Sequence, residues 1–269
     1  MDSSFAKLGR AQLHFDQLDA EVKAYRARDP FEWPHKLSYH LFDESLAVIT
    51  YKIHIKEQMP ATWGLVVGDI LTNLRAALDH AIFGHAAARA EVAGTPLTTA
   101  QERNLNFPVI TIANDWPNQR NRLAPLLDPA VLAVVENWQP FNQQQVPADW
   151  HQLAVLNALV NRDKHRQVRL LSYVSEEFNV KSSDHEVVRV YAQPKEMTEG
   201  AVVASMHIRR PLRQGGRSAL VPGRFHVENG YTENIDIPKV GAQRSVLTVM
   251  EALVAAVEDL LNELKAAGC

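Results

Sequence analysis

Two short polar clusters interrupt helices that are otherwise apolar, and both carry side chains suited to proton transfer or anion binding. The first is NLRAALDH at residues 73–80, with Asn73, Arg75, Asp79 and His80. An imidazole can transfer a proton near neutral pH, and a guanidinium can bind a phosphate or carboxylate in a bidentate manner. The second cluster is NRDKHR at residues 161–166. The sequence therefore predicts a polar site if the two clusters meet.

The expected positions of these side chains on their helices favour such a meeting. On a helix over residues 60–92, Asp69, Asn73 and His80 fall within about 40° of one another. Small residues surround this stripe, which indicates that another backbone passes close to it. A second helix over residues 148–165 carries its own polar stripe and end cluster, made of Asn157, Asn161, Asp163, Lys164, His165 and Arg166. Docked side by side, the stripes would place carboxylate, amide, imidazole and ammonium groups in one cleft.

The same residues also fit a purely structural network that fixes the register of the helices. In that interpretation Asp163 pairs with Arg162 or Arg166 at a helix end. Lys164, His165 and Arg166 suit a helix C-terminus because cations there interact favourably with the helix dipole. Arg75 and Asp79, at positions i and i+4, are spaced for a salt bridge. Both interpretations stay open at the level of sequence.

The spacing of Arg75 and His80, Arg-x-x-x-x-His, resembles the signature of the HEPN superfamily, four-helix bundles that include many metal-independent ribonucleases of toxin and defence systems. NLRAALDH, WQPF (138–141) and LNALVNRDKHR (156–166) are also similar, in content and order, to motifs of a group of uncharacterised bacterial proteins. The resemblance implies that Arg75 holds the scissile phosphate and that His80 takes part in acid–base transfer, with the ribose 2′-hydroxyl as nucleophile. It further implies a homodimer that brings two such motifs together.

Two features of the sequence differ from that pattern. Ala76 stands directly after the arginine, where the HEPN superfamily often has a polar residue. On a straight helix Arg75 and His80 diverge by about 140°, and Arg75 lies on the side of Asp79.

The sequence contains none of the common metal-binding or nucleotide-binding motifs, so we expect no cofactor. His80 and His85 are five residues apart, unlike the i,i+4 pair of HExxH zinc sites, and a zinc site from Asp69, His80 and His165 has no spacing that specifies it. No GxGxxG, Gly-x4-Gly-Lys or serine elbow occurs. His207 and His226 are interpreted as ordinary strand residues. An arginine-rich loop at 209–224 suits a solvated hairpin, or contact with a nucleic-acid backbone; its arginines are Arg209, Arg210, Arg213, Arg217 and Arg224.

Hydrophobic periodicity predicts four long helices, at 4–28, 60–92, 148–165 and 242–267, and a short one at 128–140. Alternating β-branched and aromatic residues predict an N-terminal β-hairpin from 36–42 and 46–56 and several strands between 166 and 240. We therefore expect an α+β fold: an antiparallel bundle of four long helices with an N-terminal β-hairpin and an inserted antiparallel β-sheet. The expected organisation is a single domain, 1–269, with the bundle from 1–165 and 241–269 and the β insertion from 166–240.

Composition limits the class of protein. Hydrophobic residues make up 46% and charged residues 22% of the chain, and the net charge is −3. These values are typical of a globular protein and give no overall electrostatic signal for nucleic acid. Cys269 is the only cysteine, and neither a secretory signal nor an apolar run of membrane-spanning length is visible. We expect a cytoplasmic protein without a membrane partner.

Together these observations predict a metal-independent, RNA-cleaving HEPN-like protein of a bacterial defence or toxin type, with RNA as partner and a homodimer as assembly. The alternative is a non-catalytic binding or scaffold module, for a small anion or a protein of unknown identity, whose polar helix clusters are a structural network. This alternative predicts that Arg75 is engaged with Asp79 and that no open cleft reaches His80.

Overall fold

The computed structural model describes residues 1–143, 146–165, 168, 170–174, 179–183, 185–192, 196–210, 225–228 and 231–269. These residues form a mixed α and β structure with antiparallel sheets, which confirms the expected class. The chain divides into two compact units. The helical unit comprises Met1–Glu21, Ala61–Leu170 and Ile235–Cys269, and the β unit comprises Val22–Pro60 and Leu171–Asn234.

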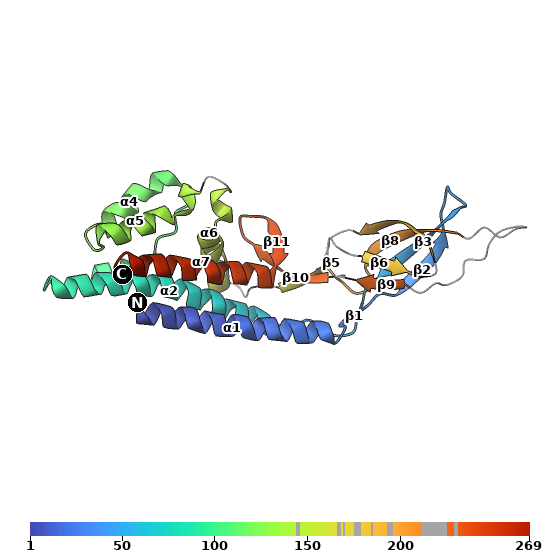
Figure 1. Ribbon diagram of the computed structural model, residues 1–269, viewed down its shortest axis with the longest axis horizontal. Helices are drawn as coiled ribbons and strands as arrows, with labels where there is room; N and C mark the ends of the chain where they lie inside the picture. Colours follow the sequence, from blue (N-terminus) through green and yellow to red (C-terminus); the bar gives the residue numbers. More distant parts are fainter. Residues whose placement is uncertain are drawn as a thin grey trace, which may run out of the picture. The chain divides into compact units, whose positions relative to one another are not determined.

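Four long helices dominate the first of these units (Figure 1): α1 (Asp2–Ala27, whose last residues belong to the β unit), α2 (Trp63–Val92), α6 (Gln152–His165) and α7 (Val246–Ala266). Helix α2 packs against α6 and α7, and α6 packs against α7. Helix α1 runs antiparallel to α2, since Ser3 contacts His80 at one end and Glu21 accepts a hydrogen bond from the Trp63 indole at the other.

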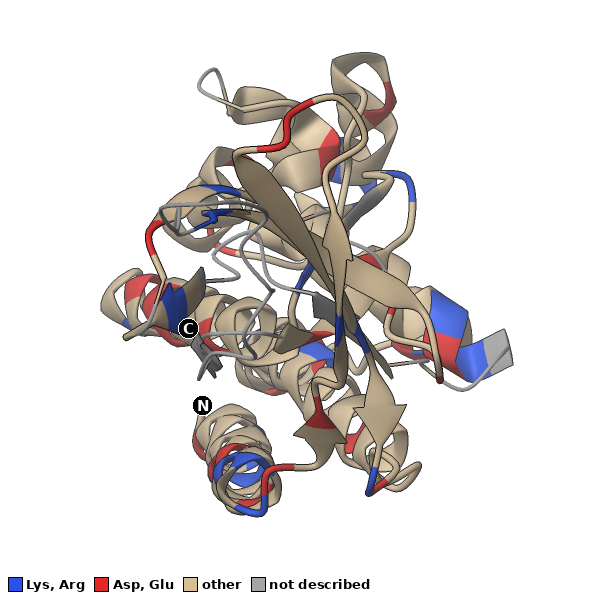
Figure 2. Ribbon diagram, turned by 90° about the vertical axis from the view of Figure 1, so that its right-hand side faces the viewer, with Lys and Arg blue, Asp and Glu red and all other residues tan. Residues whose placement is uncertain are grey.

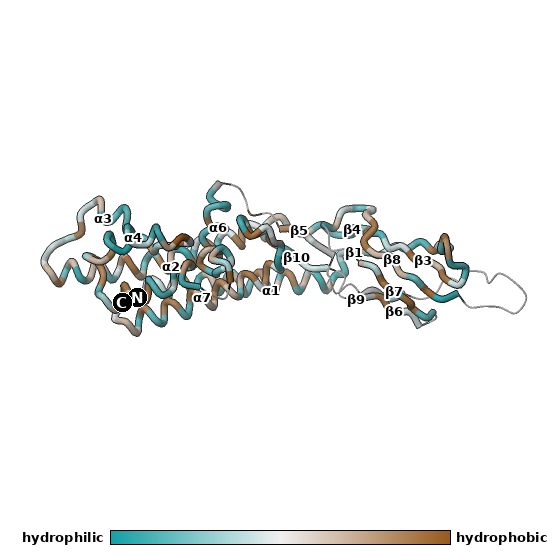
Figure 3. Tube along the Cα trace, turned by 90° about the horizontal axis from the view of Figure 1, so that it is seen from above, coloured by the Kyte–Doolittle hydropathy of each residue, from teal (hydrophilic) through white to brown (hydrophobic). Residues whose placement is uncertain are grey.

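The long helices form because each has an apolar stripe to bury. On α2 the buried residues recur at spacings of three and four, and on α7 they do the same. Figure 3 shows apolar and polar residues alternating along both helices. The fully or almost fully buried residues of these stripes include Val67, Ile70, Leu71, Leu74, Leu78, Ile82, Met250, Leu253, Val257, Leu260, Leu261 and Leu264. None of the helices in the described part of the chain has the length and apolar character that a bilayer-spanning helix needs.

Shorter elements connect α2 to α6. They are α3 (Thr99–Asn104), η1 (Ala113–Asp115), α4 (Trp116–Leu123), α5 (Pro129–Asn137), η2 (Pro140–Asn142) and η3 (Ala148–Trp150), where η denotes a 3₁₀ helix. Helix α3 starts with a capping box, in which the Thr98 hydroxyl accepts from the Gln101 N–H and the Gln101 side chain accepts from the Thr98 N–H. Between α3 and η1 the segment 105–110 is neither helix nor strand.

Strands of the β unit form antiparallel pairs. A four-stranded sheet has the order β2-β3-β8-β7, from β2 (His35–Tyr39), β3 (Leu46–Lys52), β8 (Val202–Arg209) and β7 (Val187–Ala192). Two smaller pairs are β1 (Phe31–Glu32) with β4 (His54–Ile55) and β6 (Asn179–Ser182) with β9 (Phe225–Glu228). A further three-stranded sheet has the order β11-β10-β5, from β11 (Ala242–Ser245), β10 (Tyr231–Ile237) and β5 (Leu170–Val174); β11 and the last three residues of β10 belong to the helical unit.

Strand register in the four-stranded sheet separates a buried face from an open one. Leu37, Ile49, Met206 and Val190 are opposed across the four strands, and Ile49 and Met206 are completely buried. Because side chains alternate along a strand, the residues between these positions point to the other face. That open face is polar.

The sequence located the long elements better than their ends. Helix α2 begins at Trp63, three residues after Pro60. The helix expected from 148 starts as the 3₁₀ turn η3, breaks at His151 and continues as α6. Residues 242–245 pair as β11, so α7 begins only at Val246. The single domain and the insertion at 166–240 stay predictions.

Helix α6 comes close to α2 at Gly68. A Cβ atom built on Gly68 would lie 2.8 Å from Oδ2 and 3.0 Å from Oδ1 of Asp163. Gly84, also in α2, would meet no atom within 4 Å. The Asp163 carboxylate therefore occupies the space that a side chain at position 68 would fill.

Replacing Gly84 with alanine should raise the free energy of unfolding by up to about 1 kcal/mol, because alanine is the better helix former. Gly68→Ala should gain less or lose stability, since the new methyl group must displace the Asp163 carboxylate. In an Asp163→Ala background Gly68→Ala should recover the gain. Urea unfolding of the four variants measures these differences; equal effects of the two glycine substitutions would contradict the close approach.

Candidate functional site

Arg75 and Asp79 bind the backbone of the irregular segment that crosses α2. The Nη2 of Arg75 donates to the Phe107 carbonyl oxygen at 2.6 Å, and its Nε donates to Oδ2 of Asp79 at 3.2 Å. The other Asp79 oxygen accepts the Phe107 N–H at 2.9 Å. The Arg75 side chain is only 16% exposed. One salt bridge on α2 thus satisfies both backbone groups of a fully buried phenylalanine.

Gln139, the second residue of WQPF, holds the other end of the same segment. Its side chain is completely buried, and its Nε2 donates to the Pro108 carbonyl at 3.1 Å and to the Val135 carbonyl at 2.8 Å. Its Oε1 accepts the Ile110 N–H at 2.9 Å. The Phe141 N–H donates to the Ile110 carbonyl at 3.2 Å. We call residues 107–110, held in this way, the FPVI segment.

These contacts have a simple physical cause. Backbone groups that are buried outside helices and sheets must find other partners, because an unmade buried hydrogen bond costs about 1–3 kcal/mol. Phe107 and Pro108 are buried, and no strand pairs with them. Polar side chains on α2 and after α5 take the place of a neighbouring strand. The motifs NLRAALDH and WQPF, far apart in sequence, therefore meet at the FPVI segment.

His80 lies on a different side of α2. Its imidazole is exposed, and its Nδ1 is 2.7 Å from the Ser3 hydroxyl of α1. Asp69 is also exposed, and the Asn73 amide donates to the Asp69 carbonyl of its own helix at 2.8 Å. This stripe of α2 therefore faces α1 and solvent.

The predicted residues of α6 point in two different directions. Asp163 lies against Gly68 of α2, as described above. Asn157 and Asn161 instead line a polar pocket of about 190 Å³. Its other lining residues are Val109, Thr111, Asp149, Ala154, Ala158, Pro238 and Lys239. Lys239, in the turn between β10 and β11, has a left-handed backbone with φ of +67°.

The remaining residues of the second cluster do not enter this pocket. Arg162 donates to the Asp236 carboxylate at 2.6 Å and to the Asp236 carbonyl at 3.2 Å, so it pairs with β10 and not with Asp163. Lys164 is exposed. The side chain of His165, and Arg166 entirely, lie outside the described residues, as do Arg213, Arg217 and Arg224 of the arginine-rich loop.

The structure thus spreads the predicted site residues over the helical unit instead of gathering them in one crevice. Arg75 and Asp79 lie at the FPVI segment, and His80 lies beside α1. Asn157 and Asn161 line the polar pocket, whereas Asp163 lies against Gly68 of α2. The helices α2 and α6 are neighbours, as the small residues on α2 indicated, but their amide and imidazole stripes do not face each other.

Sequence reasoning missed the residues that complete these locations. Ser3, Phe107 and Lys239 carry no motif of their own. Gln139 had a usable signal, because it lies within WQPF and is an amide inside an otherwise apolar stretch. Among the described residues, no group of three or more His, Cys, Asp or Glu side chains is placed to hold a metal ion.

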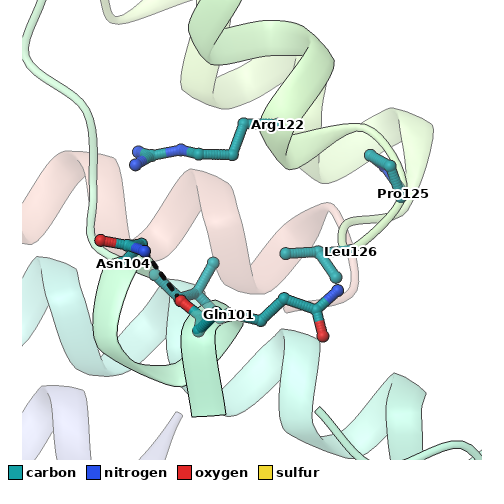
Figure 4. Close-up of a pocket in the computed structure, with 7 residues that line it drawn as sticks. Gln101, Asn104, Arg122, Pro125 and Leu126 are labelled. Atoms are coloured by element: carbon teal, nitrogen blue, oxygen red, sulfur yellow. Dashed lines mark hydrogen bonds between the residues drawn. The ribbon is translucent and has the colours of Figure 1, made fainter. Parts of the chain in front are cut away.

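A larger and more apolar pocket of about 320 Å³ lies between α3 and the chain after α4 (Figure 4). Two of its polar residues are already used within α3. Gln101 completes the capping box, and the Asn104 amide donates to the Ala100 carbonyl at 2.9 Å. The pocket contains none of the predicted site residues.

Comparisons with protein-family models, with curated proteins and with solved structures give no match for this chain.

The FPVI network should show strong energetic coupling. Arg75→Ala and Asp79→Ala should each lower the free energy of unfolding by about 1–3 kcal/mol, because each leaves a Phe107 backbone group without its partner. A double-mutant cycle should give a coupling of at least about 0.5 kcal/mol. The exposed pair Arg120 and Glu136, 3.6 Å apart, is the control, with an expected coupling of about 0–0.5 kcal/mol. Coupling no larger than the control would contradict the network.

Two buried histidines should make the helical unit sensitive to acid. Burial lowers the pKa of His151, and burial also lowers the pKa of His85, against the opposing effect of the Asp128 carboxylate. The His151 Nδ1 accepts the Leu153 N–H at 3.2 Å. A folded-state pKa below that of the unfolded chain means that the unfolded chain binds the proton more tightly. Stability is therefore complete above about pH 6.5 and decreases as the pH falls through the folded-state values.

His151→Asn should weaken this dependence, since asparagine can still accept a hydrogen bond at the start of α6 but does not titrate. Melting temperatures between pH 8 and pH 5 measure the effect. The variant should be less stable at pH 8, where ring packing against Trp138 is lost, but should lose less stability on acidification. His14→Asn on α1 is the control. A decline as steep as that of the unmodified protein would exclude the assigned role of His151.

Proposed function

We propose that this chain is a non-catalytic binding module, in which the polar clusters of the helical unit build and stiffen a binding surface. The observation that carries the proposal is the engagement of Arg75. Its guanidinium binds the Asp79 carboxylate and the Phe107 carbonyl, and Asp79 in turn binds the Phe107 N–H. A guanidinium used in this way cannot bind a substrate phosphate unless the buried backbone of Phe107 loses its partner.

The FPVI segment also supports a binding role. Val109 of this segment and Thr111 after it form one wall of the polar pocket that Asn157 and Asn161 line. Side-chain amides offer donors and acceptors, Asp149 offers a carboxylate and Lys239 an ammonium group. Arg75 and Gln139 hold the backbone of the FPVI segment on either side of Val109. The pocket is therefore preorganised, which lowers the entropic cost of binding. A small molecule with both donors and acceptors fits this chemistry.

A second candidate function is metal-independent RNA cleavage by Arg75 and His80, in a bundle of α1, α2, α6 and α7 of HEPN-like type. The exposed imidazole of His80 favours it, because a general acid or base must reach its substrate. Within one chain, Arg75 and His80 contact different neighbours, so this candidate requires a homodimer or the release of Arg75.

An RNA cleavage assay in the presence of a chelator separates the two candidates. Single-stranded RNA incubated with the purified protein should stay intact, because Arg75 is not free to bind the phosphate. His80→Ala and Arg75→Lys serve as matched variants, with product lengths read on a gel. Light scattering over a range of concentrations reports whether a dimer forms.

Cleavage by the unmodified protein that His80→Ala abolishes would overturn the binding proposal in favour of the nuclease. Equal cleavage by both proteins would exclude a mechanism through His80 and would also contradict a non-catalytic function, whereas the binding proposal requires that neither protein cleaves the RNA.

A further inference from the structure

The open face of the four-stranded sheet in the β unit carries a line of rings that ends in a guanidinium. The ring centroids of His40 and His207 are 5.0 Å apart, and those of His207 and Tyr191 are also 5.0 Å apart. The Arg189 Cζ lies 4.7 Å from the centroid of the Tyr191 ring. The line begins beyond the end of β2 and crosses β8 to β7.

Strand register confirms that these side chains share one face. Arg189 is opposite His207, which is opposite Val48 of β3. One row further, Tyr191 is opposite Ser205, and the row continues across β3 to Lys36 of β2. These positions alternate with the buried ones, so they point away from the core. Tyr191 is 39% exposed, and Arg189 and Lys36 are exposed as well.

The same face is positively charged although the whole chain has a net charge of −3. Lys36, Arg189 and Arg209 supply three cations among the outward positions of these strands (basic residues are blue and acidic residues red in Figure 2). Glu186 provides the carboxylate nearest in register, and it is paired with Arg209 at 2.9 Å. Within the described part of the chain, neither Lys36 nor Arg189 forms an ion pair that would reduce its attraction for an anion.

The His40 ring, at one end of the line, is held in place before any ligand binds. The Nδ1 of His40 accepts the N–H groups of Phe42 and Asp43 at 3.3 and 3.0 Å, which fixes its imidazole at the hairpin turn. Partial burial, His40 and Arg189 together lower the pKa of His207, so its ring is neutral at pH 7. Fixed flat rings lose little conformational entropy when another ring stacks on them.

We propose that this face binds single-stranded nucleic acid, with unpaired bases stacking on the rings of Tyr191 and His207 and phosphates contacting Arg189 and Lys36. Aromatic side chains on a sheet stack bases regardless of sequence, and adjacent cations follow the backbone. Four strands spaced about 4.8 Å apart span roughly 14 Å, which is enough for two or three bases. This inference goes beyond the proposed function of the helical unit.

An anionic membrane is the other partner that a basic face could attract. Leu41 and Phe42 at the turn between β2 and β3 are 88% and 93% exposed, and an apolar tip of this kind could enter a bilayer. However, Asp43 and Glu44 follow directly, and carboxylates at the tip would be repelled by anionic headgroups. The observations therefore favour nucleic acid.

Fluorescence anisotropy with a labelled 12-nucleotide RNA of mixed sequence tests the proposal on the full chain. Tyr191→Ala should raise Kd roughly 5- to 150-fold, because one stacking partner is lost. Tyr191→Phe keeps the ring and should bind like the unmodified protein. Arg189→Gln and Lys36→Gln should raise Kd and reduce the salt dependence by about 0.7 per lost phosphate contact. Lys56→Gln, whose lysine pairs with Glu32 on β1, is the charge-matched control and should leave Kd unchanged.

Single-stranded DNA of the same sequence should bind by the same residues, whereas duplex RNA should bind more weakly because its bases are not free to stack. Equal affinity for duplex and single strand, or unchanged affinity in Tyr191→Ala, would overturn the stacking proposal. No binding by the folded, unmodified protein at low salt would overturn it entirely, as would binding to anionic vesicles that depends on Leu41 and Phe42 without binding to RNA. The cleavage assay uses His80 and Arg75, so failure of one proposal is distinguishable from failure of the other.

Discussion

The buried backbone of the FPVI segment is the constraint on which the helical unit depends. Phe107 and Pro108 pass through the core without a neighbouring strand, so the N–H group of Phe107 and the C=O groups of both residues must be paired by side chains. Arg75, Asp79 and Gln139 do this from two directions. Each is a polar residue in an apolar environment, and each is tolerated there because its hydrogen-bonding groups are used.

This constraint gives the first polar cluster a physical meaning. Helix α2, which buries an apolar stripe, carries an arginine and an aspartate at i and i+4 because together they present a donor and an acceptor to the backbone of one residue, Phe107. The polar pocket depends on the same hydrogen bonds, since Val109 and Thr111 line the pocket only if the backbone around them is held in place. The same geometry explains why a motif that resembles a catalytic signature is compatible with a binding role.

The sequence predicted the mixed class, the long helices and the antiparallel pairing well, because periodicity over many residues records which face is buried. It predicted the site less well. Periodicity showed that α2 and α6 are neighbours, but it could not show that Asp163 contacts Gly68 whereas Asn157 turns toward Val109, since a small rotation of α6 decides between them. Periodicity did not predict helix α3, which begins with a capping box. It did not predict the structure of the FPVI segment either, because that segment is held by contacts with residues about 30 positions away in the sequence.

The carboxylate seated over Gly68 has a consequence for how the helical unit assembles. A shift of one turn along α2 toward its C-terminus would bring the Asp163 side chain against Leu71 or Thr72, which lie on the same side of the helix as Gly68. Either side chain would fill the space that the carboxylate needs. The missing side chain at position 68 and the short charged side chain on α6 therefore fit together, and sliding of α6 in that direction during folding meets a steric barrier.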